Sequence, residues 1–242
     1  MKTLITCALL ATTALPGMTA ADELTEEQIK ELVYEAIREN PGIIMEAVAI
    51  LERSQQQAQE NAVAKVLNEE RDRLEQDPNA IVLGNPDGDV TVVEFFDYNC
   101  PYCRRVMPEV YTLVEQDPNV RLVYREWPIL GEGSDFAARA ALASRNQGLY
   151  EEFHIAMMAM EDRAEEASVL RIAREVGLDI EQLRQDMDAP EIDEHIATSM
   201  DLTRALGFSG TPSFVIGDAL IPGYVEAQVL IDEVDKTRAQ AN

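Results

Sequence analysis

A β-α-β unit in the middle of the chain constrains the fold more than any other segment. Residues 90–96 form a β-rich run, residues 100–116 a helical segment, and residues 120–127 a second β-rich run. A helical region rich in Ala and Met follows over residues 134–206, and then come a hairpin around Gly217-Asp218 and a last helix. This order of β-α-β, helical region and β-β-α predicts an α/β fold with a helical insertion.

The first 21 residues have the pattern of a secretory signal peptide. Lys2 supplies the positive start, residues 4–15 form an apolar stretch, and Thr19-Ala20-Ala21 provide small residues for cleavage. The stretch is too short to span a bilayer, and no later segment reaches about 18 uninterrupted apolar residues. Cleavage also removes Cys7, so that the mature chain keeps two of its three cysteines.

Two helices are predicted between the signal peptide and the β-α-β unit. The first covers residues 23–39 and begins at a capping box of Thr25 and Gln28. The second has no glycine or proline from residue 43 to residue 76, and its residues follow heptad spacing: Ile44, Val48, Leu51, Gln55, Ala58 and Ala62. Such a helix either forms an oligomerisation arm or folds back onto its own domain. We favour an arm over residues 22–76, followed by a second domain over residues 77–242.

The acidic composition argues against a nucleic-acid partner. The chain has 45 Asp and Glu against 20 Lys and Arg, which gives a net charge of −25 at pH 7. Phosphate groups are repelled by such a surface. A high negative charge is otherwise typical of a surface that keeps a protein in solution.

The two remaining cysteines, Cys100 and Cys103, lie three positions apart at the start of the predicted central helix. A disulfide between them closes a ring too short to stabilise the fold much, so we interpret the pair as a reversible redox centre. The helix N-terminus offers unpaired N–H groups and the positive end of the dipole to a Cys100 thiolate. We expect Cys100 to be the nucleophile and Cys103 the resolving thiol, with Pro101 at the first helical position.

Half of a zinc site is the alternative interpretation of the two cysteines. It needs two further ligands, and besides carboxylates the mature chain offers only His154 and His195, at no recognisable spacing. We therefore predict no metal site, and no cofactor other than the redox-active disulfide itself.

The dipeptide Thr211-Pro212 is a second candidate element, because it follows Gly210 and precedes the strand at Phe214. A cis proline beside the redox pair would leave the backbone of Thr211 free to pair with a client peptide as a strand does. The alternative is that this proline only forms a turn.

Three separated motifs resemble the DsbA family of thiol–disulfide oxidoreductases over about residues 80–240. They are VEFFDYNCPYC (residues 93–103), REWPIL (residues 125–130) and GTPSF (residues 210–214). The resemblance implies a thioredoxin fold with a helical insertion, an active site at Cys100 and Cys103, and client contacts by Pro101, Tyr102, Thr211 and a cis Pro212. It also implies that Glu94 handles the proton of the resolving thiol. The alternative for Glu94 is a partner for a lysine or a water inside the strand layer.

The N-terminal run NPGIIMEA (residues 40–47) resembles ScsC-like proteins, several of which are oligomers with disulfide isomerase activity and links to copper tolerance. This resemblance implies a periplasmic homo-oligomer, with a trimer as one form, that acts on exported client proteins containing cysteine. It also implies a membrane redox partner, either an oxidant of the DsbB type or a reductant of the ScsB or DsbD type. The Pro101-Tyr102 dipeptide differs from the Pro-His of the strongest DsbA oxidants, so oxidation and isomerisation both stay open.

Two other functions are alternatives to thiol–disulfide exchange. The paired thiolates could bind Cu(I), which favours soft sulfur ligands, in a copper-handling protein. Alternatively, the chain could be an inactive adaptor that keeps the fold for an interaction.

Overall fold

The computed structural model describes residues 24–241, and the predicted signal peptide with Cys7 lies outside them. The chain divides into two compact units, Met1–Gln56 and Gln57–Asn242. Among the described residues, no helix is both long enough and apolar enough to cross a membrane.

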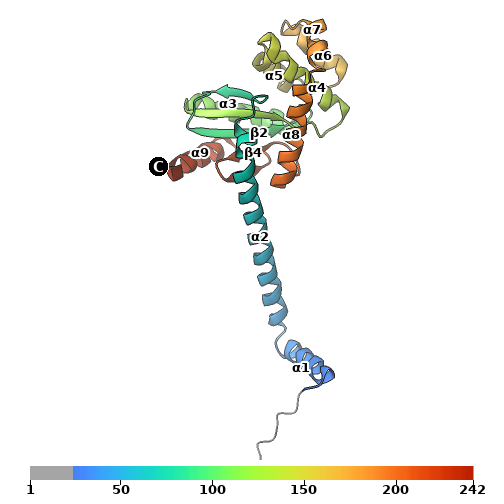
Figure 1. Ribbon diagram of the computed structural model, residues 1–242, viewed down its shortest axis with the longest axis vertical. Helices are drawn as coiled ribbons and strands as arrows, with labels where there is room; N and C mark the ends of the chain where they lie inside the picture. The colour runs from blue at the N-terminus through green and yellow to red at the C-terminus, as the bar shows by residue number, and fades with distance from the viewer. Residues whose placement is uncertain (1–23, 242) are drawn as a thin grey trace, which may run out of the picture. The chain divides into compact units, whose positions relative to one another are not determined.

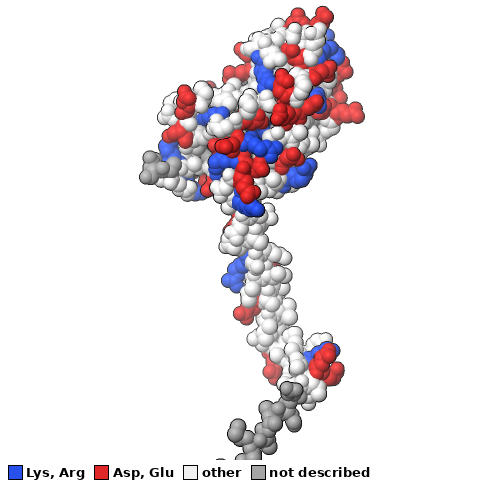
Figure 2. Space-filling view, viewed as in Figure 1, with Lys and Arg blue, Asp and Glu red and all other residues white. Residues whose placement is uncertain are grey.

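The N-terminal unit contains α1 (Glu26–Glu39) and the first part of α2 (Gly42–Glu75). The predicted capping box is confirmed: Gln28 N donates to Thr25 Oγ1 at 3.3 Å, and Thr25 N donates to Gln28 Oε1 at 2.9 Å. Large apolar side chains of both helices are exposed by 40% to 57%, namely Ile29, Leu32, Val33, Ile44, Val48 and Leu51. The face of α2 shown in Figure 2 carries few charged side chains. An apolar surface of this kind is typical of a protein–protein interface.

The last turns of α2 belong to the second unit and pack against its sheet. Leu67 and Leu74 are buried in one cluster with Phe95, and the Arg71 guanidinium pairs with Asp218 at 2.5 Å. The boundary between the two units therefore lies at Gln56–Gln57, whereas the sequence placed it after residue 76. Burial of these leucines joins the end of α2 to the sheet. The helix thus combines features of both predictions, an exposed first part and a last part folded onto the domain.

The second unit is built on a five-stranded sheet in the order β1-β3-β2-β4-β5. The strands are β1 (Ile81–Gly84), β2 (Val90–Phe96), β3 (Val120–Glu126), β4 (Ser213–Ile216) and β5 (Ala219–Pro222). Strands β2 and β3 are parallel, and the other pairs are antiparallel. Helix α3 (Pro101–Gln116) connects β2 to β3, and α9 (Ala227–Ala241) packs beside α3. This order confirms the predicted thioredoxin fold.

Side chains of β2 alternate between the two faces of the sheet. Val92 and Phe96 belong to the larger core cluster, which includes the inner faces of α3 and α9. Val93 and Phe95 belong to the smaller cluster, which includes the end of α2 and α8 (Pro190–Leu206). The period of two places Glu94 on the same face as Val92 and Phe96, beneath α3.

The helical insertion follows β3 and contains α4 (Glu132–Ser144), α5 (Tyr150–Met158), α6 (Glu166–Glu175), α7 (Ile180–Asp186) and α8, with a 3₁₀ turn at Arg145–Gln147. Gly148 and Gly177, which lie after the 3₁₀ turn and after α6, have φ angles of 70° and 91°. Helices α4 to α7 gather beside the sheet in Figure 1. The helices of this insertion run from Glu132 to Leu206, next to the predicted range of about residues 134–206.

Candidate active site

The redox pair lies where β2 ends and α3 begins. Cys100 is the N-cap residue of α3, with φ −81° and ψ 117°, and its sulfur accepts a hydrogen bond from Cys103 N at 3.4 Å. Pro101 occupies the first turn, where a missing N–H costs no helical hydrogen bond. Both cysteines are free thiols and both are buried, whereas Tyr102 is 57% exposed. The capping position gives the Cys100 sulfur the N–H groups that a thiolate needs.

The two thiols differ in acidity although they are one helical turn apart. A hydrogen bond from the Cys103 side chain lowers the pKa of Cys100 to about 6 against the opposing effect of burial, and Thr211 and backbone hydrogen bonds lower it further. Burial raises the pKa of Cys103 well above its ordinary value, and the neighbouring Cys100 adds to this effect. At neutral pH, Cys100 is therefore mostly a thiolate and Cys103 keeps its proton.

Glu94 is a buried carboxyl group on the face of β2 that α3 covers. Only 2% of Glu94 is exposed, and burial, together with the charge of Cys100, raises its pKa to about 8. Its charge also contributes to the raised pKa of Cys103. In the sheet, Glu94 pairs with Tyr124 of β3, whose buried hydroxyl has no hydrogen-bond partner. Glu94 can therefore change its protonation state near neutral pH, close to both thiols in electrostatic terms.

The Thr211-Pro212 segment lies against the redox pair. Its peptide bond is cis, as expected. In its protonated form, the Cys100 thiol donates to the Thr211 carbonyl oxygen at 3.2 Å. Pairing of β4 with β2 supports this approach, because Ser213 lies opposite Phe95. The structure thus brings Thr211 and Pro212 beside Cys100, while the side chain of Tyr102 extends into solvent.

Two polar side chains next to the cysteines, Asn99 and Arg104, tie the redox segment to the insertion, and sequence reasoning missed Asn99. Asn99 Oδ1 accepts from Ala164 N at 2.8 Å, and Asn99 Nδ2 donates to Ala164 O at 3.1 Å. The Arg104 guanidinium donates to the carbonyl oxygens of Tyr98, Met160 and Asp162 at 2.7 to 3.0 Å. Asn and Arg beside a redox motif are a weak signal, because their carbonyl partners in the insertion lie 56 to 65 residues away in the chain.

Both histidines are buried in the helical insertion. His154 of α5 shares a 3.0 Å hydrogen bond with the Tyr98 hydroxyl, and burial lowers the pKa of His154 to about 4. His195 of α8 lies 2.8 Å from the Glu126 carboxylate. Within residues 24–241, no group of three or more His, Cys, Asp or Glu side chains is arranged to hold a metal ion.

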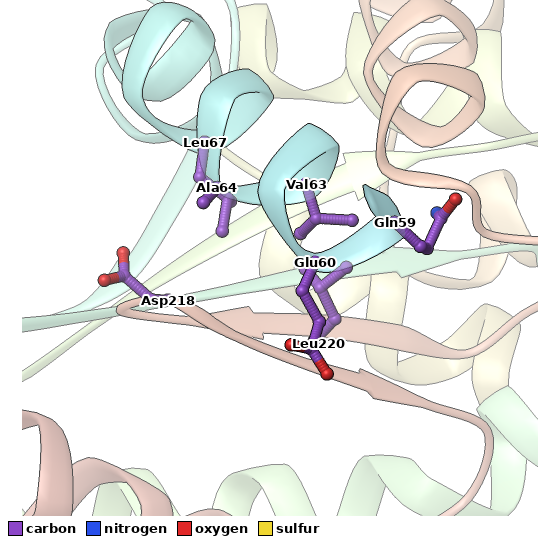
Figure 3. Close-up of a pocket in the computed structure, with 7 residues that line it drawn as sticks. All are labelled: Gln59, Glu60, Val63, Ala64, Leu67, Asp218 and Leu220. Atoms are coloured by element: carbon purple, nitrogen blue, oxygen red, sulfur yellow. The ribbon is translucent and has the colours of Figure 1, made fainter. Parts of the chain in front are cut away.

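A shallow pocket of about 300 Å³ lies between the end of α2 and the β4–β5 hairpin (Figure 3). Its lining is mostly apolar and includes Val63, Leu67 and Leu220, with Asp218 at one edge. The hairpin turn at Gly217-Asp218 is at the opposite end of β4 from Pro212. The pocket is therefore separate from the redox pair.

Two family models match the chain. A model of the DSBA-like thioredoxin domain matches residues 91–235, which is more than half of the chain. A model described as the N-terminal domain of the copper resistance protein ScsC matches residues 26–58. The two matches follow the division of the structure into an N-terminal helical unit and a second unit with the redox pair.

Two curated relatives are similar to part of this chain. The Na(+)/H(+) antiporter NhaA 3 of Salinispora tropica is 34% identical over 137 residues, which cover 56% of this chain and 21% of the antiporter. The chain thus spans about a fifth of the length of that relative. A probable disulfide bond formation protein D of Bacillus anthracis is 30% identical over 165 residues, which cover 62% of this chain and 76% of that protein.

Three solved structures are similar to this one. A thioredoxin-like oxidoreductase from Silicibacter pomeroyi is 71% identical, with a TM-score of 0.69, and covers 70% of this chain and 98% of that chain. A linker-deletion variant of Proteus mirabilis ScsC is 28% identical, with a TM-score of 0.67 and coverages of 92% and 100%. A periplasmic thioredoxin-like protein from Salmonella enterica is 30% identical, with a TM-score of 0.64 and coverages of 70% and 95%.

Proposed function

This chain belongs to the family of DSBA-like thioredoxin domains, with a ScsC-type N-terminal region, and on that premise we propose that it catalyses thiol–disulfide exchange in exported proteins. The redox pair Cys100 and Cys103 carries the reaction. No cofactor takes part other than the disulfide that the pair forms when it is oxidised.

The observation that carries this proposal is the opposite acidity of the two thiols. Cys100 has a pKa of about 6 and lies 3.2 Å from the Thr211 carbonyl oxygen, whereas burial holds the pKa of Cys103 high. A nucleophile must be a thiolate at working pH, and a resolving thiol must wait until a mixed disulfide has formed. A structural pair of thiols needs no such difference.

In the reduced form, the Cys100 thiolate attacks one sulfur of a client disulfide. That S–S bond breaks, the other client sulfur leaves as a thiolate and takes up a proton, and a mixed disulfide joins Cys100 to the client. Cys103 then loses its proton and attacks the Cys100 sulfur, which releases the second client thiolate. Two electrons have moved from the pair to the client, and oxidation of a client dithiol is the reverse reaction.

Glu94 takes the proton of Cys103 when that thiol attacks, and returns it when Cys103 leaves as a thiolate. A carboxyl group with a pKa of about 8 exchanges protons near neutral pH, unlike an ordinary glutamate. Burial beneath α3 keeps this exchange away from bulk solvent. Glu94 therefore acts in the resolving step rather than in the first attack.

The client chain runs past Thr211 and Pro212. Its sulfur reaches Cys100, and its backbone pairs with the Thr211 main chain as an added strand would. The exposed Pro101 and Tyr102 contact the client beside the attacked sulfur.

The proposed protein acts in the periplasm as an oligomer and depends on a membrane redox partner. The N-terminal 21 residues direct export to the periplasm, where disulfides persist. The exposed apolar side chains of α1 and α2 associate in a homo-oligomer, of which a trimer is one form, because an uncovered stripe of this kind favours self-association. A membrane-bound thiol–disulfide oxidant or reductant restores the pair after each cycle.

Reduction of insulin and refolding of scrambled ribonuclease test the activity. We expect Cys100→Ala to abolish both reactions, and Cys103→Ser to accumulate mixed disulfides with clients, because no thiol resolves them. Asp87→Asn, at an exposed position in the turn before β2 and outside the proposed client contacts, serves as a folded control. Unchanged rates in Cys100→Ala would contradict the enzyme and favour an adaptor.

The direction of exchange is read from the resting redox state in cells, trapped by acid and alkylation. A pair that is mostly reduced supports isomerisation, whereas a fully oxidised pair supports oxidation of clients. An arm that brings several redox pairs to one client favours isomerisation.

Cu(I) binding is the second candidate, favoured by the copper-resistance description of the family that matches residues 26–58. Metal binding requires both thiols as thiolates, and the raised pKa of Cys103 opposes this. Titration of the reduced protein with Cu(I) against a chromogenic chelator decides between the two. Binding of one Cu(I) that Cys103→Ser abolishes would support the copper function.

A further inference from the structure

The Asp97 carboxylate is a buried group that joins two loops at the edge of the sheet. Only 2% of Asp97 is exposed. Its Oδ1 accepts from Asn99 N at 2.7 Å, and its Oδ2 accepts from Ile129 N at 2.8 Å and from Leu130 N at 2.9 Å. Three backbone N–H groups on one carboxylate make a rigid junction, because each of these bonds involves an ionised acceptor.

The first of the two loops is the redox turn, residues 97–100. Asp97 O accepts from Cys100 N at 3.0 Å, so the side chain and the carbonyl of Asp97 together close this turn. A backbone hydrogen bond from Asp97 also reaches Cys103, where it partly offsets the raised pKa of that thiol. The position of both sulfurs therefore depends on the geometry at Asp97.

The second loop follows β3, which runs parallel to β2, so both loops leave the same edge of the sheet. Trp127 N donates to Phe96 O at 2.8 Å, and the Asp97 carboxylate holds the next turn of the loop. Ile129 and Leu130 are 37% and 41% exposed although they are large and apolar. Their backbone N–H groups are bound to Asp97 and their side chains are free to meet another molecule.

We propose that Asp97 is a positioning residue that fixes the Ile129–Leu130 loop beside the redox turn, so that an apolar client residue next to the client cysteine packs on Ile129 and Leu130. This inference rests on the proposed thiol–disulfide exchange and adds a preference among clients. The carboxylate acts through the two loops and does not touch the reacting sulfurs with its side chain.

Only an ionised carboxylate satisfies all three N–H groups. An asparagine side chain has one oxygen, and its NH₂ group would face one set of donors. A serine hydroxyl is shorter. It closes the turn to Asn99 N in the same way but leaves Ile129 N and Leu130 N without an acceptor. Asp97→Ser therefore separates the two roles, and Asp97→Ala removes both.

Two peptide probes test the proposal, each a short peptide whose single cysteine is joined to glutathione. One has leucine next to the cysteine and the other has serine there, and hydroxyethyl disulfide serves as a substrate without a peptide. For Asp97→Ser, we expect KM for the leucine peptide to rise about tenfold while kcat and the rate with hydroxyethyl disulfide stay within about twofold. Asp97→Ala should in addition shift the pKa of Cys100, followed by thiolate absorbance.

Controls keep the outcomes separate. Asp87→Ser, in the exposed turn before β2, should leave all three substrates unchanged. Ile129→Ala alters an exposed side chain, so it should fold normally and reproduce the loss of preference for the leucine peptide. The double variant with Asp97→Ser should then lose little more than either single variant.

Three results would overturn the proposal. They are an unchanged KM for the leucine peptide in Asp97→Ser, an equal loss with hydroxyethyl disulfide, or an unchanged preference in Ile129→Ala. If the variant at Asp97 does not fold, the Ile129→Ala comparison alone decides. If the unmodified protein reduces none of the three substrates, the proposed function fails rather than this inference.

Discussion

Replacement of Glu94 by glutamine tests the electrostatics of the redox centre through stability. The change keeps the size of the side chain and removes its titration. In the folded chain the pKa of Glu94 is raised from 4.5 to about 8, mainly by burial and then by the charge of Cys100. The unfolded chain loses this proton near the ordinary value.

The sign and size of the effect follow from proton linkage. Between these two pKa values the folded state binds the Glu94 proton and the unfolded state does not, so the free energy of unfolding falls as the pH rises. The full stabilisation is present below pH 4.5 and is lost as the pH rises through about 8. At about 1.36 kcal/mol per pH unit, the whole range corresponds to about 5 kcal/mol, and the interval from about pH 5 to about pH 8 to about 4 kcal/mol.

Cys100 contributes with the opposite sign. Its pKa is lowered from 9.0 to about 6, so the reduced protein gains stability as the pH rises through that range. Between about pH 6 and about pH 8, the contributions of these two groups oppose each other in the unmodified protein. The informative quantity is the difference in unfolding free energy between Glu94→Gln and the unmodified protein.

We expect this difference to shift in favour of Glu94→Gln by about 4 kcal/mol between about pH 5 and about pH 8, measured by urea unfolding under reducing conditions. Glu161→Gln, at an exposed position, is the matched control and should show no such trend. In a Cys100→Ala background the trend should become smaller but persist, because burial is the larger cause. A difference that stays constant with pH would refute the assignment of a raised pKa to Glu94.

Three further predictions concern other parts of the chain. Cys103→Ala should raise the pKa of Cys100 from about 6 toward 9.0, followed by thiolate absorbance, because the Cys103 hydrogen bond is its largest stabilising cause. Asp77→Ala should lower the unfolding free energy by about 3 to 5 kcal/mol in urea, because Arg125 is fully buried and pairs with Asp77 at 2.5 Å. Deletion of residues 22–56 should give a monomer by light scattering whose second unit keeps its stability within about 1 kcal/mol, since the compact units divide there.

Each of these has a clear opposing result. If the pKa of Cys100 stays near 6 without Cys103, the N-terminus of the helix alone stabilises the Cys100 thiolate. A loss below about 1 kcal/mol for Asp77→Ala would mean that Arg125 finds another acceptor. An unchanged oligomer after the deletion would place the association surface in the second unit. Deletion through residue 76 should cost about 4 kcal/mol more, because it also removes the buried Leu67 and Leu74.

The fold was predictable because its main signals are local in sequence. The β-rich run at residues 90–96, the cysteine pair and the next strand define the β-α-β unit, and Gly217-Asp218 marks the hairpin. The capping box at Thr25 and Gln28 fixes the start of α1 from residues three positions apart. Periodicity and turn residues sufficed at each of these places.

The end of α2 was not predictable in the same way. The heptad residues of its first part continue in register through Ala62, but Leu67 and Leu74 lie on the face that meets the sheet. No glycine or proline interrupts the helix near these two leucines. A helix can pack against a different part of the protein along its length without a change in its backbone. The division between units at Gln56–Gln57 therefore follows from burial and not from any local signal.

Side chains that join distant segments were likewise hidden from sequence reasoning. Asp97 binds N–H groups 32 and 33 residues away, and Asn99 binds the backbone of Ala164, 65 residues away. In sequence both are ordinary polar residues before a cysteine. Glu94 could be singled out only through the family resemblance, because a single carboxyl group in a strand does not reveal the depth at which it is buried.

The stabilisation of the Cys100 thiolate can be compared with the difference in reduction potential between disulfide reductants and oxidants. At pH 7, a Cys100 pKa of about 6 instead of 9.0 stabilises the reduced pair by about 1.4 kcal/mol, which is about 30 mV for two electrons. Thioredoxin-type reductants and DsbA-type oxidants differ by about 150 mV. Stabilisation of the Cys100 thiolate thus accounts for about a fifth of this difference in potential, so by itself it makes the pair somewhat more oxidising but not a strong oxidant. In the function proposed above, the redox partner rather than the Cys100 thiolate therefore sets the direction, and a change of partner should reverse it in the same protein.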